Sequence, residues 1–216
     1  MLKYETIIFD KDGTLLDSAP GVLNSVHYAL DRLGLPFPAG LEARQLVGPP
    51  LRHTYHHLLG VSLDRLDEAV DLHREYYGAR GLFEAAPYAG AVRLLADLHG
   101  AGGRVCIATT KYRPLAQRML EHFELTPYIF HAEMSDGTEM SSAKAGMLKR
   151  TLERSGASAD HAVMIGDTRY DAEAARDTGI PFIGVLFGYG TRAEMEAVGA
   201  RYFVKNMDEL RAKLWA

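Results

Sequence analysis

Short apolar runs that alternate with stretches of helical periodicity place the strongest constraint on the fold of this chain. The runs are rich in Ile, Val, Phe and Met, and most of them end in small or polar residues. Apolar side chains at successive positions are typical of strands buried on both faces, as in a parallel sheet. The expected strands are residues 6–9, 104–108, 128–132, 162–165 and 181–186, with a weaker candidate at 201–204.

Helices are expected between these runs. Apolar residues recur there at spacings of three and four, which predicts helices over residues 90–100, 114–123 and 143–155. A regular alternation of strands and helices predicts an α/β fold with right-handed crossovers. We therefore expect a Rossmann-like core of three layers built around a parallel sheet.

Residues 16–85 are the exception to this alternation, because no convincing strand pattern occurs there. The apolar spacing predicts one helix that begins after Asp17 or Ser18. Further helices are expected over residues 51–59 and 64–78. This part of the chain is therefore predicted to be entirely helical.

The length of 216 residues suits one core domain with a smaller insertion. We expect an α/β core domain made of residues 1–15 and 86–216, and a small all-helical cap domain over 16–85, inserted after the first strand. With 47% apolar residues the chain can bury a core without covalent staples. The single cysteine, Cys106, lies in an apolar run and is expected to be a buried thiol.

The charge balance is mildly acidic. Lys and Arg total 24 and Asp and Glu total 28, a formal net charge of −4. This balance argues against nucleic acid or a membrane surface as a partner. No apolar stretch approaches the length of a membrane span, and the first residues lack the pattern of a signal peptide. We expect a cytoplasmic protein; the sequence carries no signal for its oligomeric state.

Two aspartates, Asp10 and Asp12, follow the first expected strand directly. In doubly wound folds, ligands bind beyond the carboxyl ends of the strands, so this is a candidate site. The sequence "DGT" is also common in turns, which explains Asp12 and Gly13 but not Asp10, an anion at the end of a buried strand. A calcium-binding loop would need glycine at its sixth position, whereas Gly13 is the fourth residue from Asp10.

Other expected strands also end in polar residues. Asp167 follows the strand at 162–165, and Asp171 lies one helical turn further on. Thr109 and Thr110 follow another strand, and Lys144 opens a helix. Carboxylates, hydroxyls and a fixed cation are the groups that phosphoryl transfer requires, commonly with Mg²⁺.

These segments resemble a known family. The segments "DKDGT" and "GDTRYD", together with the first threonine of "IATT" and with Lys144, are similar to the four motifs of the haloacid dehalogenase-like hydrolase superfamily, in the order found there. The helical insert resembles the small cap of that family. The segments "FDKDGTLLDSAPG", "LVGPPL" and "VLFGYGT" further resemble the phosphoglycolate phosphatase group, in a branch described as 5′-nucleotidase-like.

The resemblance implies roles for the acids. Asp10 would attack phosphorus and form an aspartyl-phosphate. Asp12 would protonate the leaving oxygen and later deprotonate water, so we expect a raised pKa for Asp12. Asp10, the backbone carbonyl of Asp12, and Asp167 would hold Mg²⁺, while Asp171 would support the metal site from behind or through water.

The resemblance also implies a phosphate site. Thr109 would donate a hydrogen bond to a phosphate oxygen, although Thr110 remains an alternative. Lys144 would neutralise the transferring group, and Gly13 would let the backbone turn tightly beside it. The sequence departs from the family pattern at Lys11, where an apolar residue is usual. This lysine would either point outward or add charge near the site.

The cap is expected to select the substrate. By resemblance, a loop that contains Gly48 and Arg52 faces the active site, although a simple capping loop with a solvated arginine is the alternative. The residues His53, His56 and His57 have spacings that suit a metal, but a packed or solvated cap face is favoured. Three tyrosines could supply a shelf for a nucleotide base: Tyr55, Tyr76 and Tyr77.

The predicted function is that of a Mg²⁺-dependent phosphomonoesterase acting on a small phosphorylated metabolite, either phosphoglycolate or a nucleoside monophosphate. A dehalogenase would not need an acid at position 12. A sugar phosphomutase of the same superfamily remains an alternative, since it uses the same pair of acids. A non-catalytic binding protein on this fold is the other alternative.

Overall fold

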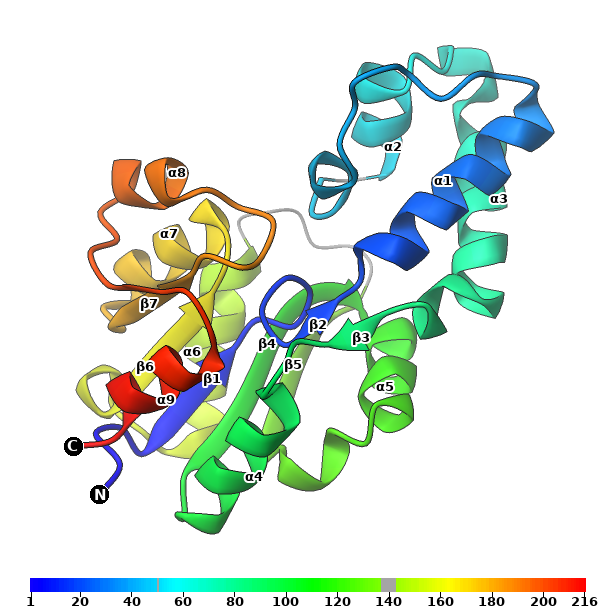
Figure 1. Cartoon of the computed structure of the whole chain (residues 1–216). Helices are drawn as coiled ribbons and strands as arrows, with labels where there is room; N and C mark the ends of the chain where they lie inside the picture. The colour runs from blue at the N-terminus through cyan, green and yellow to red at the C-terminus, as the bar shows by residue number, and fades with distance from the viewer. Residues whose placement is uncertain (50, 137–142) are drawn as a thin grey trace. The chain divides into compact units, whose positions relative to one another are not determined.

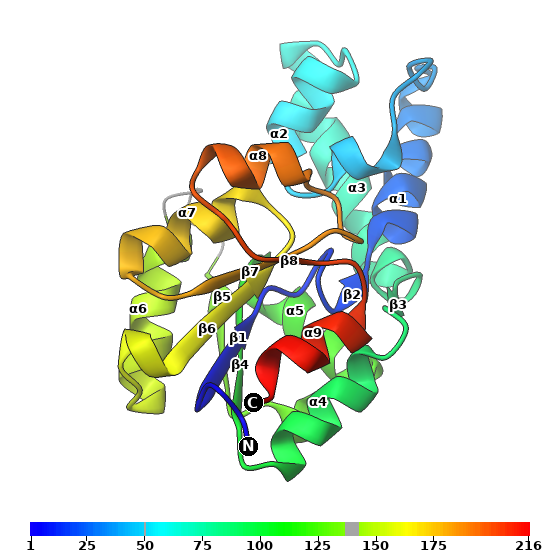
Figure 2. The same ribbon diagram turned by 60° about the vertical axis from the view of Figure 1, so that its left-hand side comes forward.

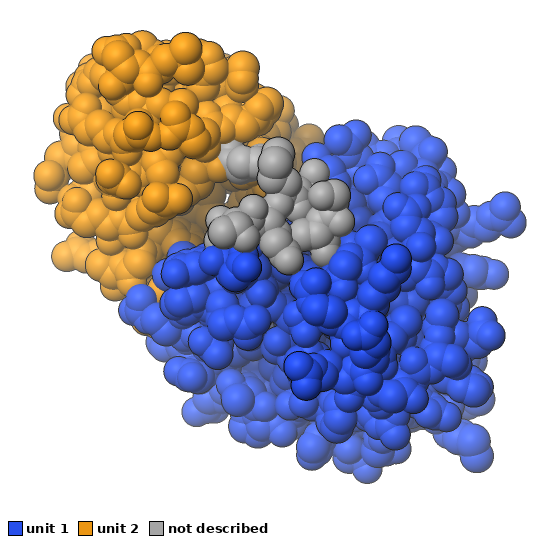
Figure 3. Space-filling model, turned by 180° about the vertical axis from the view of Figure 1, so that it is seen from behind, with its two compact units in different colours: residues 1–17, 87–216 blue, residues 18–86 orange. Residues whose placement is uncertain are grey.

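The structure, a computed structural model, describes residues 1–49, 51–136 and 143–216. Pro50 of the predicted cap bend and residues 137–142, in the loop before Lys144, lie outside the described residues. The chain divides into two compact units, which Figure 3 distinguishes by colour. A core unit comprises Met1–Asp17 and Pro87–Ala216, and a helical unit comprises Ser18–Ala86.

The core unit is built on a six-stranded sheet in which every strand pair is parallel (Figure 1). The strand order is β5-β4-β1-β6-β7-β8, so the first strand lies in the middle of the sheet. The strands are β1 (Thr6–Phe9), β4 (Arg104–Tyr112), β5 (His131–Ser135), β6 (Ala162–Gly166), β7 (Phe182–Val185) and β8 (Phe203–Val204). The predicted α/β fold class is confirmed.

Helices cover both faces of the sheet. Figures 1 and 2 show α6 and α7 on one face and α4 and α9 on the other. The helices of this unit are α4 (Ala91–Gly100), α5 (Arg113–His122), α6 (Ala143–Ser155), α7 (Arg169–Thr178), α8 (Arg192–Ala197) and α9 (Met207–Leu214), with 3-10 turns at Thr126–Tyr128 and Ala159–His161. None of the helices in the described part of the chain combines the length and apolarity that a membrane span requires.

The sheet is buried on both faces, as its continuous apolar runs require. Ile8, Cys106 and Met164 of adjacent strands pack with Met147 and Leu148 of α6 in one apolar cluster. Cys106 is a free, buried thiol as expected, and burial raises its pKa to about 12. It is therefore part of the core, and burial disfavours the reactive thiolate form.

The third predicted strand was placed too early along the chain. The prediction covered residues 128–132, whereas β5 is His131–Ser135 and Thr126–Tyr128 form a 3-10 turn. Pro127 explains the shift, since it favours the first turn of a helix and cannot donate to a ladder. In the opposite direction, β4 extends to Tyr112 and includes both threonines of the second motif.

The helical unit is built on two long helices that pack together, α1 (Ala19–Leu33) and α3 (Leu66–Ala79). The helix predicted over 51–59 is a short α2 (Leu51–His53) that continues as a π-helical turn, Thr54–Leu58. Three 3-10 segments complete the unit: Ala43–Leu46, Leu63–Arg65 and Gly81–Phe83. Where the chain leaves and re-enters the core, β2 (Leu16–Asp17) and β3 (Ala86–Pro87) form a two-stranded sheet.

The interior of the helical unit contains two of the tyrosines that were considered for a nucleotide shelf. Tyr55 is fully buried, and its hydroxyl lies 3.1 Å from Nδ1 of the buried His73. Tyr77 is also buried and stacks on the ring of His73. The prediction that Tyr55 and Tyr77 contribute to such a shelf is therefore wrong, because both rings are buried in the interior of the helical unit.

Helix α1 approaches the turn at Gly81–Phe83 so closely that only glycine fits at position 21. A Cβ atom on Gly21 would overlap the carbonyl oxygen of Gly81, which is rigid backbone. Gly78 in α3 is different, because a Cβ atom there meets nothing within 4 Å. These two helical glycines form a matched pair for a test of packing.

We predict that Gly21→Ala lowers the free energy of unfolding by about 2 kcal/mol, the usual range for overpacking. Gly78→Ala should raise it by about 0.5 kcal/mol, since alanine restricts the unfolded chain. Urea unfolding followed by circular dichroism measures both changes. Equal stability of the two variants would contradict the close approach of α1 to Gly81.

Candidate active site

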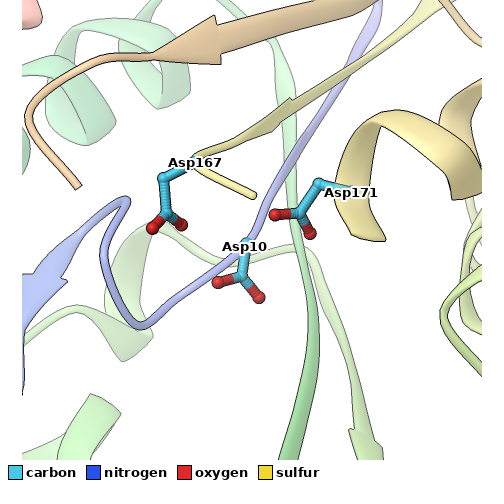
Figure 4. Close-up of side chains that lie close together, drawn as sticks. All are labelled: Asp10, Asp167 and Asp171. Carbon is cyan, nitrogen blue, oxygen red and sulfur yellow. The ribbon is translucent and has the colours of Figure 1, made fainter. Parts of the chain in front are cut away.

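Three aspartates that are far apart in the sequence converge at one edge of the central sheet (Figure 4). Asp10 follows β1 and Asp167 follows β6, and these strands are paired so that Phe9 lies opposite Ile165. Asp171 lies in the first turn of α7. Carboxylate oxygens of the three residues lie within 4.8 Å of one another. The predicted convergence of the acids is thus present in the geometry.

Lys144 supplies a positive charge to this cluster. It lies at the start of α6, and its Nζ atom donates to Asp10 Oδ1 at 2.5 Å and to Asp171 Oδ1 at 2.8 Å. Burial lowers the pKa of Lys144, but the two carboxylates outweigh burial and raise it above its ordinary value. The positively charged form of Lys144 is therefore favoured, and it pairs with two of the three aspartates.

One ammonium does not balance three buried carboxylates. Burial raises the pKa of Asp167 to about 8, with further contributions from the charges of Asp171 and Asp10. Burial also raises the pKa of Asp10, to about 6, against the opposing effect of Lys144. A divalent cation would supply the missing charge, and clustered carboxylate oxygens are the donors that a hard cation such as Mg²⁺ prefers. The residues present therefore fit a metal ion.

Hydrogen bonds fix the orientation of Asp167. Its Oδ1 atom accepts from Thr14 Oγ1 at 3.0 Å, and its Oδ2 atom accepts from the backbone N–H of Tyr189 at 2.9 Å. The Tyr189 hydroxyl donates in turn to Asp17 at 2.9 Å. Thr14 and Tyr189 were not predicted, although both belong to quoted motifs, "DKDGT" and "VLFGYGT".

Asp171 is held more completely by protein groups than Asp167 is. Its Oδ2 atom accepts from the N–H of Thr168 at 3.1 Å and from the Thr168 hydroxyl at 2.8 Å, while Oδ1 receives Lys144. The spacing of Thr168 and Asp171 is that of a helix capping box, a signal that could have identified Thr168. This arrangement suits a residue that holds other groups of the site, such as Lys144, in position.

Glycines allow the backbone to approach Asp167. Gly13 has a φ of 84°, in the left-handed region that favours glycine, and a Cβ atom there would overlap the Asp167 carboxylate. A Cβ atom on Gly188 would also overlap Asp167. Gly13 is therefore needed both for its conformation and for the space beside the acid.

Asp12 lies in the turn after β1 with its side chain 15% exposed. Lys11 Nζ donates to Asp12 Oδ1 at 2.7 Å, and Lys111 Nζ lies 3.4 Å from Asp12 Oδ2. Lys11 is buried, so the outward orientation is wrong and its ammonium adds charge near the site. Burial lowers the pKa of Lys11 to about 8, although the Asp12 carboxylate opposes that change. The raised pKa expected for Asp12 stays a prediction.

The two threonines of the second motif differ in burial. Thr109 is buried in β4, and its Oγ1 atom accepts from the N–H of Lys111 at 3.3 Å. Thr110 is exposed. Because β4 is the neighbour of β1, both threonines lie near the edge from which Asp10 emerges.

The predicted cap residues lie in the helical unit. Gly48 has a φ of 105°, and Arg52 is exposed and pairs with Asp67. The rings of His53 and His57 lie 4.7 Å apart, centroid to centroid. Among the described residues, the aspartate cluster is the one group of three or more His, Cys, Asp or Glu residues close enough together to hold a metal.

Comparison with known proteins identifies the family. A family model described as haloacid dehalogenase-like hydrolase matches residues 7–185. The chain therefore belongs to the haloacid dehalogenase-like hydrolases, and the resemblance inferred from the motifs is confirmed.

Individual relatives match almost the whole chain. The chain is 33% identical over 216 residues to a 5′-nucleotidase of Pseudomonas aeruginosa, covering 99% of this chain and 96% of the relative. It is 35% identical over 215 residues to the tyrosine-protein kinase PtkA of Mycobacterium tuberculosis, covering 97% and 72%. It is 32% identical over 212 residues to a phosphoglycolate phosphatase of Caulobacter vibrioides, covering 92% and 86%.

Solved structures agree. A haloacid dehalogenase-like hydrolase from Streptococcus pneumoniae superimposes with a TM-score of 0.88 at 31% identity, and the match covers 98% of both chains. The fold and the family are therefore established together.

We predict that Mg²⁺ binds more tightly at pH 8.5 than at pH 6, because protons compete for carboxylates whose pKa values are raised. A raised folded-state pKa stabilises the metal-free protein at low pH, and that stability is lost as the pH rises toward about 8. Calorimetric titration at both pH values, in two buffers of different ionisation enthalpy, measures the affinity and the protons released.

The variant Asp167→Asn is the control for this prediction. It should bind Mg²⁺ poorly at both pH values and, without metal at pH 8, should melt at a higher temperature than the parent. An affinity that does not change with pH, with no proton release, would contradict the prediction.

Proposed function

We propose that the chain is a Mg²⁺-dependent phosphomonoesterase that hydrolyses a small phosphorylated metabolite, phosphoglycolate or a nucleoside monophosphate, through an aspartyl-phosphate on Asp10. The enzyme class is that of the phosphatases, given the family and its relatives. The observation that carries the proposal is the convergence of Asp10, Asp167 and Asp171, with Lys144 bound to Asp10 and Asp171.

Mg²⁺ would be held by Asp10, Asp167 and the backbone carbonyl of Asp12. When bound there, it would neutralise charge on the carboxylate and on the phosphate group. Asp171 would keep Lys144 in place and would support the metal ligands without binding the metal directly, which its three contacts with protein groups favour.

In the first step, a carboxylate oxygen of Asp10 attacks phosphorus and the bond to the leaving oxygen breaks. Asp12 gives a proton to that oxygen, so that the product leaves as an alcohol. The product on the protein is an acyl phosphate, which water cleaves more readily than an alkyl phosphate. This chemistry explains why an aspartate, and not a serine, would occupy position 10.

In the second step, Asp12 accepts a proton from a water molecule, and the water oxygen attacks the same phosphorus atom. The bond between phosphorus and Asp10 breaks, which releases inorganic phosphate and restores the carboxylate. Lys144 offsets the negative charge on Asp10 and on the transferring group during both steps. Asp12 thus changes from acid to base between the steps.

The phosphate oxygens would receive hydrogen bonds from Thr109 or Thr110. Thr109 remains the preferred residue because its buried hydroxyl lies on rigid β-structure. Gly13 would give the phosphate access to the backbone of the turn beside Asp167. Both features reduce the reorganisation needed as charge moves in the transition state.

The helical unit would select the substrate. Gly48 and Arg52 are the candidates, and Arg52 would exchange its partner Asp67 for an anionic substrate group. The relatives are named for reactions that all transfer a phosphoryl group, but the substrates in their names differ. The loss of Tyr55 and Tyr77 to the cap interior removes one argument for a nucleotide.

We predict that Asp10→Asn reduces phosphate release by about a thousandfold or more, because it removes the nucleophile. Release of inorganic phosphate is measured with Mg²⁺ over a panel that contains phosphoglycolate, nucleoside monophosphates and sugar phosphates. Asp160→Asn makes the same chemical change on an exposed aspartate and should leave the rates unchanged.

Three outcomes separate the alternatives. Phosphate release that Asp10→Asn abolishes supports the phosphatase. Movement of the phosphate to another position of a sugar, seen by phosphorus NMR without release, would indicate a phosphomutase. If no member of the panel reacts and Asp10→Asn behaves like the parent, a non-catalytic binding protein replaces the enzyme.

A further inference from the structure

The residue between the two aspartates of the first motif is a lysine whose side chain is completely buried. Its exposed fraction is 0%. Removing an ammonium from water is costly unless a partner compensates the charge. Lys11 therefore requires a specific interaction that offsets this cost.

That interaction is with Asp12, its neighbour in the chain. Lys11 Nζ donates to Asp12 Oδ1 at 2.7 Å and to the thioether sulfur of Met119 at 3.3 Å. Successive side chains in extended backbone point to opposite sides, so adjacency alone does not bring these two groups together. The lysine reaches the carboxylate because the chain turns after Asp10 and because Met119, on α5, encloses the end of the side chain.

A second lysine approaches Asp12 from another element. Lys111 Nζ lies 3.5 Å from Oδ1 and 3.4 Å from Oδ2 of Asp12. The two ammonium groups differ in exposure, since Lys111 is 15% exposed and Lys11 is not exposed at all. Of these two lysine contacts, the buried one has the length of a strong charge-assisted hydrogen bond, so Lys11 constrains the orientation of the carboxylate more strongly than Lys111 does.

Orientation matters for the role proposed for Asp12. A carboxylate that exchanges protons with a leaving group and then with water must lie within hydrogen-bond reach of both, and errors of about 1 Å are costly. Asp12 has a short side chain in a turn, with 15% of its surface exposed. Lys11 has no exposed surface with which to touch a substrate, and the carboxylate to which it donates a hydrogen bond is that of Asp12.

We propose that Lys11 is a positioning residue, whose buried ammonium holds the Asp12 carboxylate in the orientation needed for proton transfer. This inference rests on the proposed function. It adds to that function a buried cation that orients the Asp12 carboxylate. The hydrogen bond to Asp12 offsets part of the free-energy cost of burying the Lys11 ammonium, and it restricts the orientation of the Asp12 carboxylate.

The test is a double-mutant cycle with Lys11→Met, Asp12→Asn and the double variant. Methionine keeps an unbranched apolar stem beside Met119 and removes the ammonium. Asp12 is not stranded by this change, because Lys111 remains near it. Lys149→Met, on the exposed face of α6, is the matched control and should leave the kinetics unchanged.

Two substrates are compared in the presence of Mg²⁺: phosphoglycolate, whose alkoxide leaving group needs a proton, and p-nitrophenyl phosphate, whose phenolate does not. We expect Lys11→Met to lower kcat on phosphoglycolate by about 10- to 100-fold, with KM little changed. The loss on p-nitrophenyl phosphate should be smaller. In the Asp12→Asn background, Lys11→Met should cause no further loss of kcat. The melting temperature of the Lys11→Met single variant should equal or exceed that of the parent.

The inference is overturned if Lys11→Met has the kinetics of the parent. It is also overturned if Lys11→Met lowers kcat by the same factor whether Asn or Asp occupies position 12. A lower melting temperature with equal losses on both substrates would also overturn it, since that pattern indicates a structural lysine. If the parent hydrolyses neither substrate and Asp10→Asn behaves like the parent on the whole panel, the proposed function fails, and this inference fails with it. If the parent does hydrolyse these substrates, parental kinetics of Lys11→Met, an equal loss with Asn at position 12, or a lower melting temperature with equal losses on both substrates rejects only the role of Lys11. The proposed function then stands.

Discussion

The ammonium of Lys144, held between Asp10 and Asp171, is the interaction on which this site depends. Buried carboxylates a few ångströms apart repel one another, and burial itself favours their neutral forms. Lys144 offsets the charge of two of them, while Asp167 relies on dipolar donors, the Thr14 hydroxyl and a backbone N–H. The strand order makes this possible, because β1 and β6 are parallel neighbours, so that Asp10 and Asp167, which follow them, lie at the same edge of the sheet.

The sequence was sufficient for the class of fold and for the identity of the converging acids. Strands buried on both faces need continuous apolar runs, and such runs are visible locally at β1 and β6. The limits of β5 were not visible, since Ile129 and Phe130 are as apolar as strand residues. β5 begins where its ladder with β4 begins, at His131 opposite Cys106, and the N–H of Phe130 donates to the carbonyl of Val105 just before it.

The parts of the site that escaped prediction are those that depend on tertiary contacts. The direction of Lys11 follows from the position of Met119 on α5, which the spacing of residues cannot reveal. Tyr189 acts on Asp167 through its backbone N–H, a group that every residue except proline carries. Sequence motifs identify side chains with distinctive chemistry, whereas backbone donors and buried partners become evident only in three dimensions.

The join between the helical unit and the core has an evolutionary consequence. The N–H of Tyr88 donates to the carbonyl oxygen of Leu15, so the outgoing and returning segments are tied together inside the core. Every residue of the aspartate–lysine cluster lies outside Ser18–Ala86. Insertions or deletions can therefore accumulate in that segment during evolution without replacing any residue of the cluster.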